Sequence, residues 1–152
     1  QQRLYHHIRR MVTDHDDTDD ILQNVFIKVW KNIDRFRGDS ELFTWLYRIA
    51  SNESLTFLKQ KQRRQSVSLQ DMEDKLPGGT AGPNQLSGEA IQRLLQQAIA
   101  TLPPKQRLVF TMKYYDDLKY EEISQALDTS VGALKASFHH AVKKIEHFIT
   151  HR

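Results

Sequence analysis

Apolar side chains recur with helical spacing in the first third of the chain. The clearest series covers Ile21–Ile33, with an apolar residue every three to four positions, and predicts one face of an α-helix. Asp17 or Thr18 can cap this helix, and the carboxylates at its start favour the positive end of the helix dipole. A shorter helix is predicted over residues 4–12, and a longer one from about Ser40 to Lys61.

The same spacing returns at Glu89 and continues nearly to the last residue. Leu102-Pro103-Pro104 ends one helix, and Pro104 suits the first turn of the next. Asp116-Asp117 should end that next helix. Its predicted inward-facing residues are Leu108, Val109, Met112 and Tyr114. The remaining predicted elements are a short helix near Tyr120–Leu127, a turn at Asp128-Thr129 and a final helix from about Ser130 towards Ile149.

Residues 63–88 lack this periodicity and are rich in proline, glycine and serine, which predicts a flexible linker. A structureless loop of this length is rare inside one compact domain, so we expect two domains, 1–62 and 89–152. No segment alternates apolar and polar residues as a strand would, and the predicted fold class is all-α. Domains this small are marginally stable alone, so we expect contacts with partner molecules to be important for the working state of the protein.

Composition narrows the class of protein further. The 152 residues include 22 Lys plus Arg and 19 Asp plus Glu, a net charge of +3 that is compatible with a locally basic face. The chain has no cysteine, which excludes disulfides, thiolate metal sites and cysteine nucleophiles. No apolar run is long enough to span a bilayer, and no signal peptide opens the chain, so we expect a cytoplasmic protein without membrane insertion. Because the sequence begins at Gln1, a native start upstream is also expected.

No motif predicts catalysis, and we expect no enzyme activity, metal or cofactor. The acidic run over residues 14–20 fails as a calcium loop because neither possible frame places Gly and Glu at the required positions. His147 and His151 have the i, i+4 spacing of metal ligands, but no third ligand accompanies them. The histidines, which cluster at both ends of the chain and include His6-His7, are interpreted as surface or DNA-facing side chains.

Two patterns indicate nucleic-acid binding. A short helix, a tight turn and a longer basic helix near the end of the chain have the layout of a helix-turn-helix, whose second helix enters the major groove. Residues 128–152 contain four Lys plus Arg, two acids and four histidines, and Gly132 could let backbone N–H groups approach a phosphate. Earlier in the chain, residues 35–64 interleave aromatics, including Phe43, Trp45 and Tyr47, with cations, as suits unstacked single-stranded bases.

The residues that carry these patterns closely resemble bacterial sigma factors. Residues 17–26 are similar to a segment of sigma region 2, and residues 36–52 resemble the promoter-melting segment of that region. Residues 102–107 resemble the start of region 4, and residues 120–135 its helix-turn-helix. With only these two regions present, in the right order, the chain resembles the extracytoplasmic-function (ECF) group of the sigma-70 family.

This resemblance implies a non-enzymatic factor that recruits core RNA polymerase to −10/−35 promoters and helps to open the duplex. Implied contacts to the β′ clamp of the polymerase are Asp17, Asp20, Gln23, Asn24 and Phe26. Implied contacts to single-stranded −10 DNA are Phe36, Arg37, Gly38, Asp39, Ser40, Trp45, Arg48 and Asn52. Implied contacts to the −35 duplex are Ser130, Gly132, Lys135, Ser137, His139, His140 and Lys143. The family also implies contact with the polymerase β subunit, a linker that threads towards the polymerase active centre, and an anti-sigma partner.

Some positions depart from the family pattern. Asn24 stands where Glu is usual, and Asp128 stands at a turn where Gly is usual, although Asp tolerates left-handed backbone. Ser137 and His140 stand where Arg is common, and each lacks the forked donor that binds guanine or phosphate. Two other readings stay open on the residues alone: a dimeric helix-turn-helix regulator that works without polymerase, and a module that binds only proteins.

Overall fold

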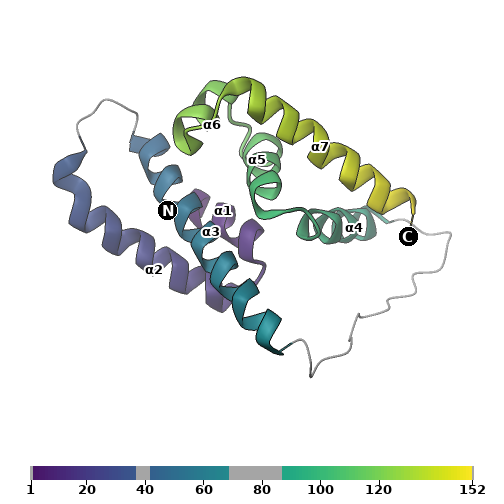
Figure 1. The fold of residues 1–152 in the computed structure, drawn as a ribbon, viewed down its shortest axis with the longest axis horizontal. Coiled ribbons are helices and arrows are strands. Elements are labelled where there is room, and N and C mark those ends of the chain that lie inside the picture. Colours follow the sequence, from purple (N-terminus) through teal and green to yellow (C-terminus); the bar gives the residue numbers. More distant parts are fainter. Residues whose placement is uncertain (1, 37–41, 69–86, 152) are drawn as a thin grey trace.

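A computed structural model describes residues 2–36, 42–68 and 87–151 of the chain (Figure 1). The described residues form helices joined by short turns and contain no strand, which confirms the predicted all-α class. The helices are α1 (Gln2–Val12), α2 (His15–Asn32), η1 (Ile33–Arg35), α3 (Leu42–Ser68), α4 (Gly88–Ala100), α5 (Pro104–Tyr114), α6 (Tyr120–Leu127) and α7 (Val131–Thr150). None of these helices is both long and apolar enough to cross a bilayer.

Helices α1, α2 and α3 pack on one another and form an N-terminal unit. The start of α2 corrects the predicted cap: Asp14, not Asp17 or Thr18, is the N-cap, and its Oδ1 accepts a hydrogen bond of 2.9 Å from Asp16 N–H. Thr18 is buried instead, with its hydroxyl donating to the Asp14 carbonyl at 2.7 Å. The helix therefore starts at the beginning of the acidic run, and most of the carboxylates stand on its first turns.

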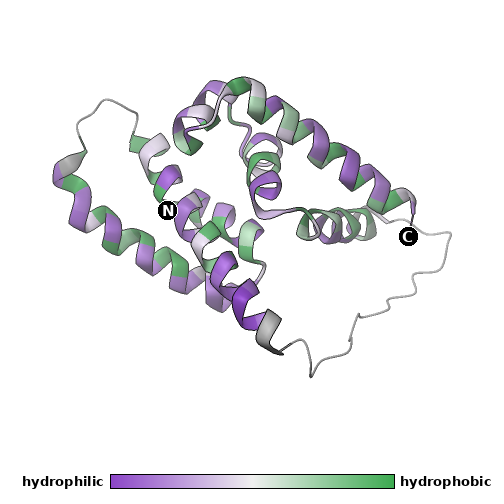
Figure 2. Ribbon diagram, viewed as in Figure 1, coloured by the Kyte–Doolittle hydropathy of each residue, from purple (hydrophilic) through white to green (hydrophobic). Residues whose placement is uncertain are grey.

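Helix α3 is longer than the sequence pattern predicted, because it continues to Ser68 instead of stopping near Lys61. Its last turns are hydrophilic, as Figure 2 shows at the end of α3 farthest from α6. Glutamine, lysine and arginine dominate residues 59–65, and these unbranched side chains are good helix formers that need no core contact. The first part of the predicted linker is thus helical, whereas residues 69–86 lie outside the described residues.

Helices α4 to α7 form a C-terminal unit in which α7 packs on α4, α5 and α6. Ser87 caps α4 by accepting from Ala90 N–H at 3.2 Å, and Pro104 occupies the first turn of α5, as predicted. Between α6 and α7, Asp128 adopts the left-handed conformation at φ 51° and ψ 49°. The turn therefore forms with Asp where glycine is the commoner choice.

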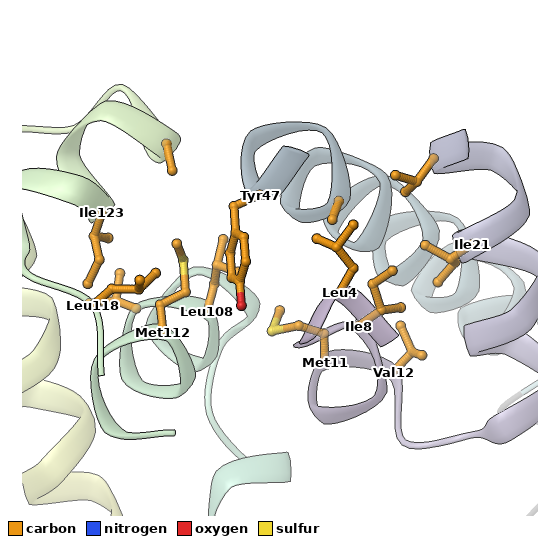
Figure 3. Packing of buried hydrophobic residues seen from close by; sticks show 14 of the residues in the cluster. Leu4, Ile8, Met11, Val12, Ile21, Tyr47, Leu108, Met112, Leu118 and Ile123 are labelled. Atoms are coloured by element: carbon orange, nitrogen blue, oxygen red, sulfur yellow. The ribbon is translucent and has the colours of Figure 1, made fainter. Parts of the chain in front are cut away.

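The two units share one hydrophobic core (Figure 3). The cluster joins Leu4, Ile8, Met11 and Tyr47 from the N-terminal unit to Leu108, Met112, Leu118 and Ile123 from the C-terminal unit. Five consecutive residues of α5, Leu108 to Met112, are buried, so this helix is covered on all sides. Tyr114 was predicted to face inward with them, but it is 57% exposed, because it lies in the last turn of α5 beyond the packed neighbours.

Candidate functional site

The outward side of α2 carries large apolar side chains that no described residue covers. Ile21 and Val25 are buried, but the same apolar stripe continues around the helix to Phe26, Ile27 and Trp30, which are 38%, 46% and 82% exposed. Only part of the predicted apolar series over Ile21–Ile33 therefore belongs to the hydrophobic core. We call Phe26, Ile27 and Trp30 the apolar α2 face.

A shallow groove of about 530 Å³ follows this face between polar edges. Its lining also includes Asp19, Gln23 and Lys31. Of the residues that the family resemblance assigns to polymerase contact, Gln23 and Phe26 line the groove, while Asp20 and Asn24 are exposed on the adjoining side of the helix. Asp17 does not line the groove; it is partly buried, and its Oδ2 lies 3.6 Å from Nζ of Lys61 on α3.

Ile27 and Trp30 were not among the site residues predicted from the sequence. The spacing of Trp30 matches a core position, and periodicity alone does not distinguish an apolar residue that packs inside from one left for a partner. One signal was available: the series is too wide for a single packed seam, since it fills two adjacent positions in every turn.

The α3 residues of the predicted −10 site share one face of that helix. Trp45, Arg48 and Asn52 are spaced i, i+3 and i+7, and neighbouring turns therefore bring them into line. Trp45 is half-buried against Phe36, with 5.2 Å between their ring centroids. We call Phe36, Trp45, Arg48 and Asn52 the α3 face. Arg37, Gly38, Asp39 and Ser40, which were assigned to the same site, lie outside the described residues.

The other aromatics of this segment belong to the core. Tyr47 is fully buried and lies 4.4 Å from Phe43, centroid to centroid, while the guanidinium of Arg3 stands 4.3 Å above the Phe43 ring. The aromatic residues predicted for base stacking thus divide: Tyr47 belongs to the core, Phe43 is partly buried against that core, and Trp45 is partly exposed beside Phe36.

Arg48 is already engaged by the C-terminal unit. Its guanidinium donates to the backbone carbonyls of Gln125 and Ala126 at the end of α6, the latter at 3.3 Å. The last carbonyls of a helix lack helical partners and carry the negative end of its dipole, so a cation is well placed there.

Helices α6 and α7 have the geometry of a helix-turn-helix. Glu122 Oε1 accepts from Lys119 N–H at 3.1 Å at the start of α6, and Ser130 caps α7 by accepting from Ala133 N–H at 3.2 Å. Ala126 is buried at the point where α6 crosses its neighbouring helices, and its small side chain allows these helices to approach closely. The predicted layout is therefore present with well-formed caps on both helices.

One side of α7 is exposed and basic. Gly132, Lys135, His139 and Lys143 follow the spacing i, i+3, i+7 and i+11 and form what we call the α7 face. All four are exposed, and so is His140 beside them. Ser137, from the same predicted set, is half-buried on the flank, and the exposed cap Ser130 precedes the first turn.

Several buried polar groups meet between α1, α3 and the end of α5, and none of them was predicted from the sequence. His7 was interpreted as a surface residue but is fully buried, and its Nε2 lies 3.0 Å from Ser51 Oγ. Its Nδ1 lies 3.5 Å from Asp116 Oδ2, and Arg10 donates to Asp116 Oδ1 at 3.2 Å. We call His7, Arg10, Tyr47, Ser51 and Asp116 the interdomain polar cluster. Burial, with the negative charge of Asp116 adding, raises the pKa of Tyr47 far above its usual value.

No group of three or more His, Asp or Glu side chains forms a metal site among the residues that the structure describes. His147 and His151 do approach, with stacked rings 4.0 Å apart, but the Nδ1 of His151 lies within hydrogen-bond distance of the His147 carbonyl and the Thr150 hydroxyl.

Comparison with protein families gives two matches. The family model described as Sigma-70 region 2 matches residues 1–64, and that described as Sigma-70, region 4 matches residues 92–145. Among curated proteins, the ECF RNA polymerase sigma-E factor of Escherichia coli strain K12 is 33% identical over 138 residues, which cover 86% of this chain and 72% of that protein. The sigma-E factor of Haemophilus influenzae is 30% identical over 142 residues, covering 88% and 75%.

Solved structures share the fold. The sigma factor RpoE of Bartonella quintana, in complex with the anti-sigma factor NepR, has a TM-score of 0.74 at 20% identity, covering 99% of this chain and 91% of that one. CnrH, in complex with the cytosolic domain of CnrY, has a TM-score of 0.69 at 18% identity, covering 97% and 80%. The likeness in fold extends over both units of the chain.

Proposed function

Because the chain belongs to the sigma-70 family, within its extracytoplasmic-function group, we propose that it binds core RNA polymerase through α2 and promoter DNA through α3 and α7. Members of this family are transcription initiation factors that give RNA polymerase its promoter specificity. The chain acts by binding and positioning, and it performs no catalytic step of its own.

The apolar α2 face is the proposed polymerase-docking surface. An indole that is 82% exposed has no structural role within the described chain, and its burial by a partner removes apolar area from water. Tryptophan is also among the residues that most often dominate a protein interface. The polar residues Asp17, Asp20, Gln23 and Asn24 border this face and would set orientation on the β′ clamp. This exposed face within region 2 is the observation that carries the proposal.

The α3 face is the proposed contact with the −10 element once its bases leave the duplex. Trp45 offers a ring for stacking, Phe36 supports that ring from the side, and Asn52 presents amide donors and acceptors on the same face. Arg48 supplies a cation for the backbone. Arg37, Gly38, Asp39 and Ser40 complete the proposed site as the sequence resemblance implies.

The α7 face is the proposed contact with the −35 duplex. Lys135, His139 and Lys143 present hydrogen-bonding and cationic groups along one side of a helix that is free to enter a major groove. Gly132 and the Ser130 cap place backbone N–H groups at the positive end of α7, where a phosphate is favoured. His140 and Ser137 flank the same surface.

The remaining proposals concern organisation and partners. Residues 1–62 act as the polymerase-binding and melting domain, 63–88 as the linker, and 89–152 as the −35-binding domain, which also contacts the polymerase β subunit. The two structural neighbours are sigma factors in complex with anti-sigma factors, which supports an anti-sigma partner for this chain as well. A cytoplasmic location follows from the proposed work on RNA polymerase.

Titration of labelled chain with core RNA polymerase tests the docking surface. The pair Phe26→Ala and Trp30→Ala should weaken binding by at least about 30-fold, since a single interface hot spot contributes about 2 kcal/mol or more. Gln60→Ala, an exposed change on α3 away from the face, serves as the matched control and should bind like the unmodified chain.

The same titration separates the rival functions. Unchanged binding by the double variant would place the docking surface elsewhere. No binding by the unmodified chain, combined with dimers on palindromic duplex DNA, would favour a free-standing helix-turn-helix regulator.

A further inference from the structure

We propose that a pocket at the boundary between the two units binds a free purine nucleotide, with its phosphates against α1 and its base against α4. The pocket measures about 500 Å³ and opens between the end of α1, one side of α4 and the residue that follows α5 (Figure 1). The residues that line it lie outside the α2, α3 and α7 faces. A nucleotide would therefore bind whether or not these faces have the functions proposed above.

The α1 side of the pocket is cationic. His6, Arg9 and Arg10 line it with the spacing i, i+3 and i+4, which places them on one side of the helix. None of the described residues in the lining is a carboxylate. Asp116 binds Arg10 at 3.2 Å, whereas Arg9 pairs with no acid in the part of the chain that the structure describes. Positive charge is thus available to an anion with several charges.

Both guanidinium groups are held in position before a ligand arrives. Arg10 donates to Asp116 and lies 4.3 Å above the ring of Tyr115. Arg9 donates to the carbonyl of Thr13, just beyond the end of its own helix. Arginine carries five N–H donors in a planar fork, so each group keeps further donors for phosphate oxygens. Donors that are already ordered reduce the entropy lost when a ligand binds.

The C-terminal ends of α1 and α4 contribute Thr13 and Ala100 to the lining, and neither end opposes an anion. The end of a helix is normally negative because its last carbonyls lack helical partners. Arg107 donates to the Met11 carbonyl at 2.7 Å and to the Ala100 carbonyl at 2.8 Å, and Arg9 donates to Thr13. These guanidinium groups satisfy the carbonyls and offset the negative ends with their own charge.

The α4 side of the pocket suits a nucleobase. Gln92 and Gln96 lie one helical turn apart and are exposed, and their amides make no hydrogen bond within the described residues. A glutamine amide offers two donors and an acceptor, and it can pair with N6 and N7 of adenine. Ile99 and Ala100 add apolar lining. A base can exchange hydrogen bonds with the amides there while its ring covers apolar surface.

The size of the pocket favours a nucleotide over a phosphate ion. Small-molecule sites usually measure about 300–1,000 Å³ and combine apolar lining with a few polar groups. The pocket, at about 500 Å³, falls in this range, and a phosphate ion would fill only its cationic side. Tyr115 also lines it, and burial raises the pKa of this tyrosine, so its hydroxyl stays a hydrogen-bond donor. A nucleotide is the ligand class that uses both sides.

Isothermal titration calorimetry of the full chain with ATP tests the site, at physiological salt and without divalent cations. One ATP should bind per chain with Kd below about 100 μM, because charge-assisted hydrogen bonds and apolar contact act together. Inorganic pyrophosphate and adenosine should each bind at least about 10-fold more weakly than ATP, since each fills only one side of the pocket.

Two variants separate the two sides of the pocket. Arg9→Gln should weaken ATP and pyrophosphate alike, by at least about 10-fold, since both lose a charge-assisted hydrogen bond. Gln96→Leu should weaken ATP by about 5-fold and leave pyrophosphate unchanged. The matched controls are Arg3→Gln, whose guanidinium lies over Phe43, and Gln97→Leu, an exposed change on α4 outside the lining. Both controls should bind ATP like the unmodified chain, and circular dichroism verifies that every variant keeps its helices.

The site is overturned if the unmodified chain does not bind ATP at about 1 mM. It is also overturned if Arg3→Gln weakens ATP as much as Arg9→Gln does, because binding then follows net charge alone. If pyrophosphate binds as tightly as ATP and Gln96→Leu has no effect, the pocket holds a bare anion and the nucleotide is excluded. None of these results changes the outcome of the polymerase titration, so a failure of the pocket and a failure of the proposed function are seen separately.

Discussion

The two helices proposed to contact DNA, α3 and α7, differ in how far other parts of the chain cover their DNA-binding faces. On α7, Gly132, Lys135 and His139 are exposed, and the Lys135 ammonium lies 5.7 Å from the centroid of the Tyr120 ring. On α3, Trp45 is half-buried and Arg48 is hydrogen-bonded to α6. One surface is ready in the free chain, whereas the other is partly occupied.

This difference matches the state of the DNA that each helix is proposed to meet. The −35 element is a duplex before the promoter opens. The α7 face, which is proposed to contact it, can therefore be exposed in the free chain. Single-stranded −10 bases exist only after melting, and an exposed aromatic and cationic face would bind any single strand it encountered before then. We expect the partial covering of α3 in the free chain to limit such binding.

The largest effect is expected at the exposed helix. Lys135→Ala should weaken binding to a −35 duplex by about 1–3 kcal/mol if the ammonium group contacts a base edge, and equally for all sequences if it contacts a phosphate. Fluorescence anisotropy with specific and scrambled duplexes distinguishes the two. Lys144→Ala, an exposed lysine on a different side of α7, is the control. If Lys135→Ala binds the −35 duplex as tightly as the unmodified chain does, the α7 face is not the contact with that duplex.

A smaller effect is expected at the covered helix, and only in the polymerase complex. Trp45→Ala should reduce promoter melting about tenfold, or ~1.4 kcal/mol, because a stacked base loses its ring. Permanganate reactivity of −10 thymines measures the melted bubble. Gln62→Ala, an exposed change on a different side of α3, is the control. A normal bubble in Trp45→Ala, with polymerase binding intact, would show that the α3 face does not capture bases.

Periodicity and capping chemistry predicted most of the fold from the sequence. The helices, the left-handed turn at Asp128 and the cap at Ser130 all follow from local rules that act within a few residues. The start of α2 was misplaced because Asp14, Asp17 and Thr18 are all capping residues, and only the packing that buries Thr18 selects among them.

What local pattern could not predict is which surfaces of the two units meet. His7 was expected at the surface, yet it is buried, and its Nδ1 lies 3.5 Å from Oδ2 of Asp116, a residue more than one hundred positions away. Trp30 shows the opposite error: its apolar character predicts a core position, but no described element covers it. Both depend on the arrangement of whole helices, which a single sequence does not encode locally.

Tyr47 provides a stability test of the covered side of α3. Burial and the charge of Asp116 raise the pKa of Tyr47, so the folded chain retains the phenol proton after the unfolded chain, with a pKa near 10, has lost it. The stabilisation is complete below pH ~10 and falls as pH rises above it, by about 1 kcal/mol between pH 10 and 11. Urea unfolding of the unmodified chain and Tyr47→Phe over this range should show curves that diverge. Parallel curves would mean that the Tyr47 phenol is accessible and the boundary already open.

The smallest effect concerns the first turn of α7, where stability and binding should change in opposite directions. A methyl group at Gly132 would meet no atom within 4 Å, so Gly132→Ala should stabilise the chain by about 0.5–1 kcal/mol through helix propensity. If the backbone there approaches a phosphate, the same methyl group should weaken binding to the −35 duplex. Gly88→Ala is a matched control, because Gly88 begins α4 and has equally open surroundings. A Gly132→Ala chain that binds the duplex as tightly as before would place the phosphate away from this turn and leave Lys135 and Lys143 as its contacts.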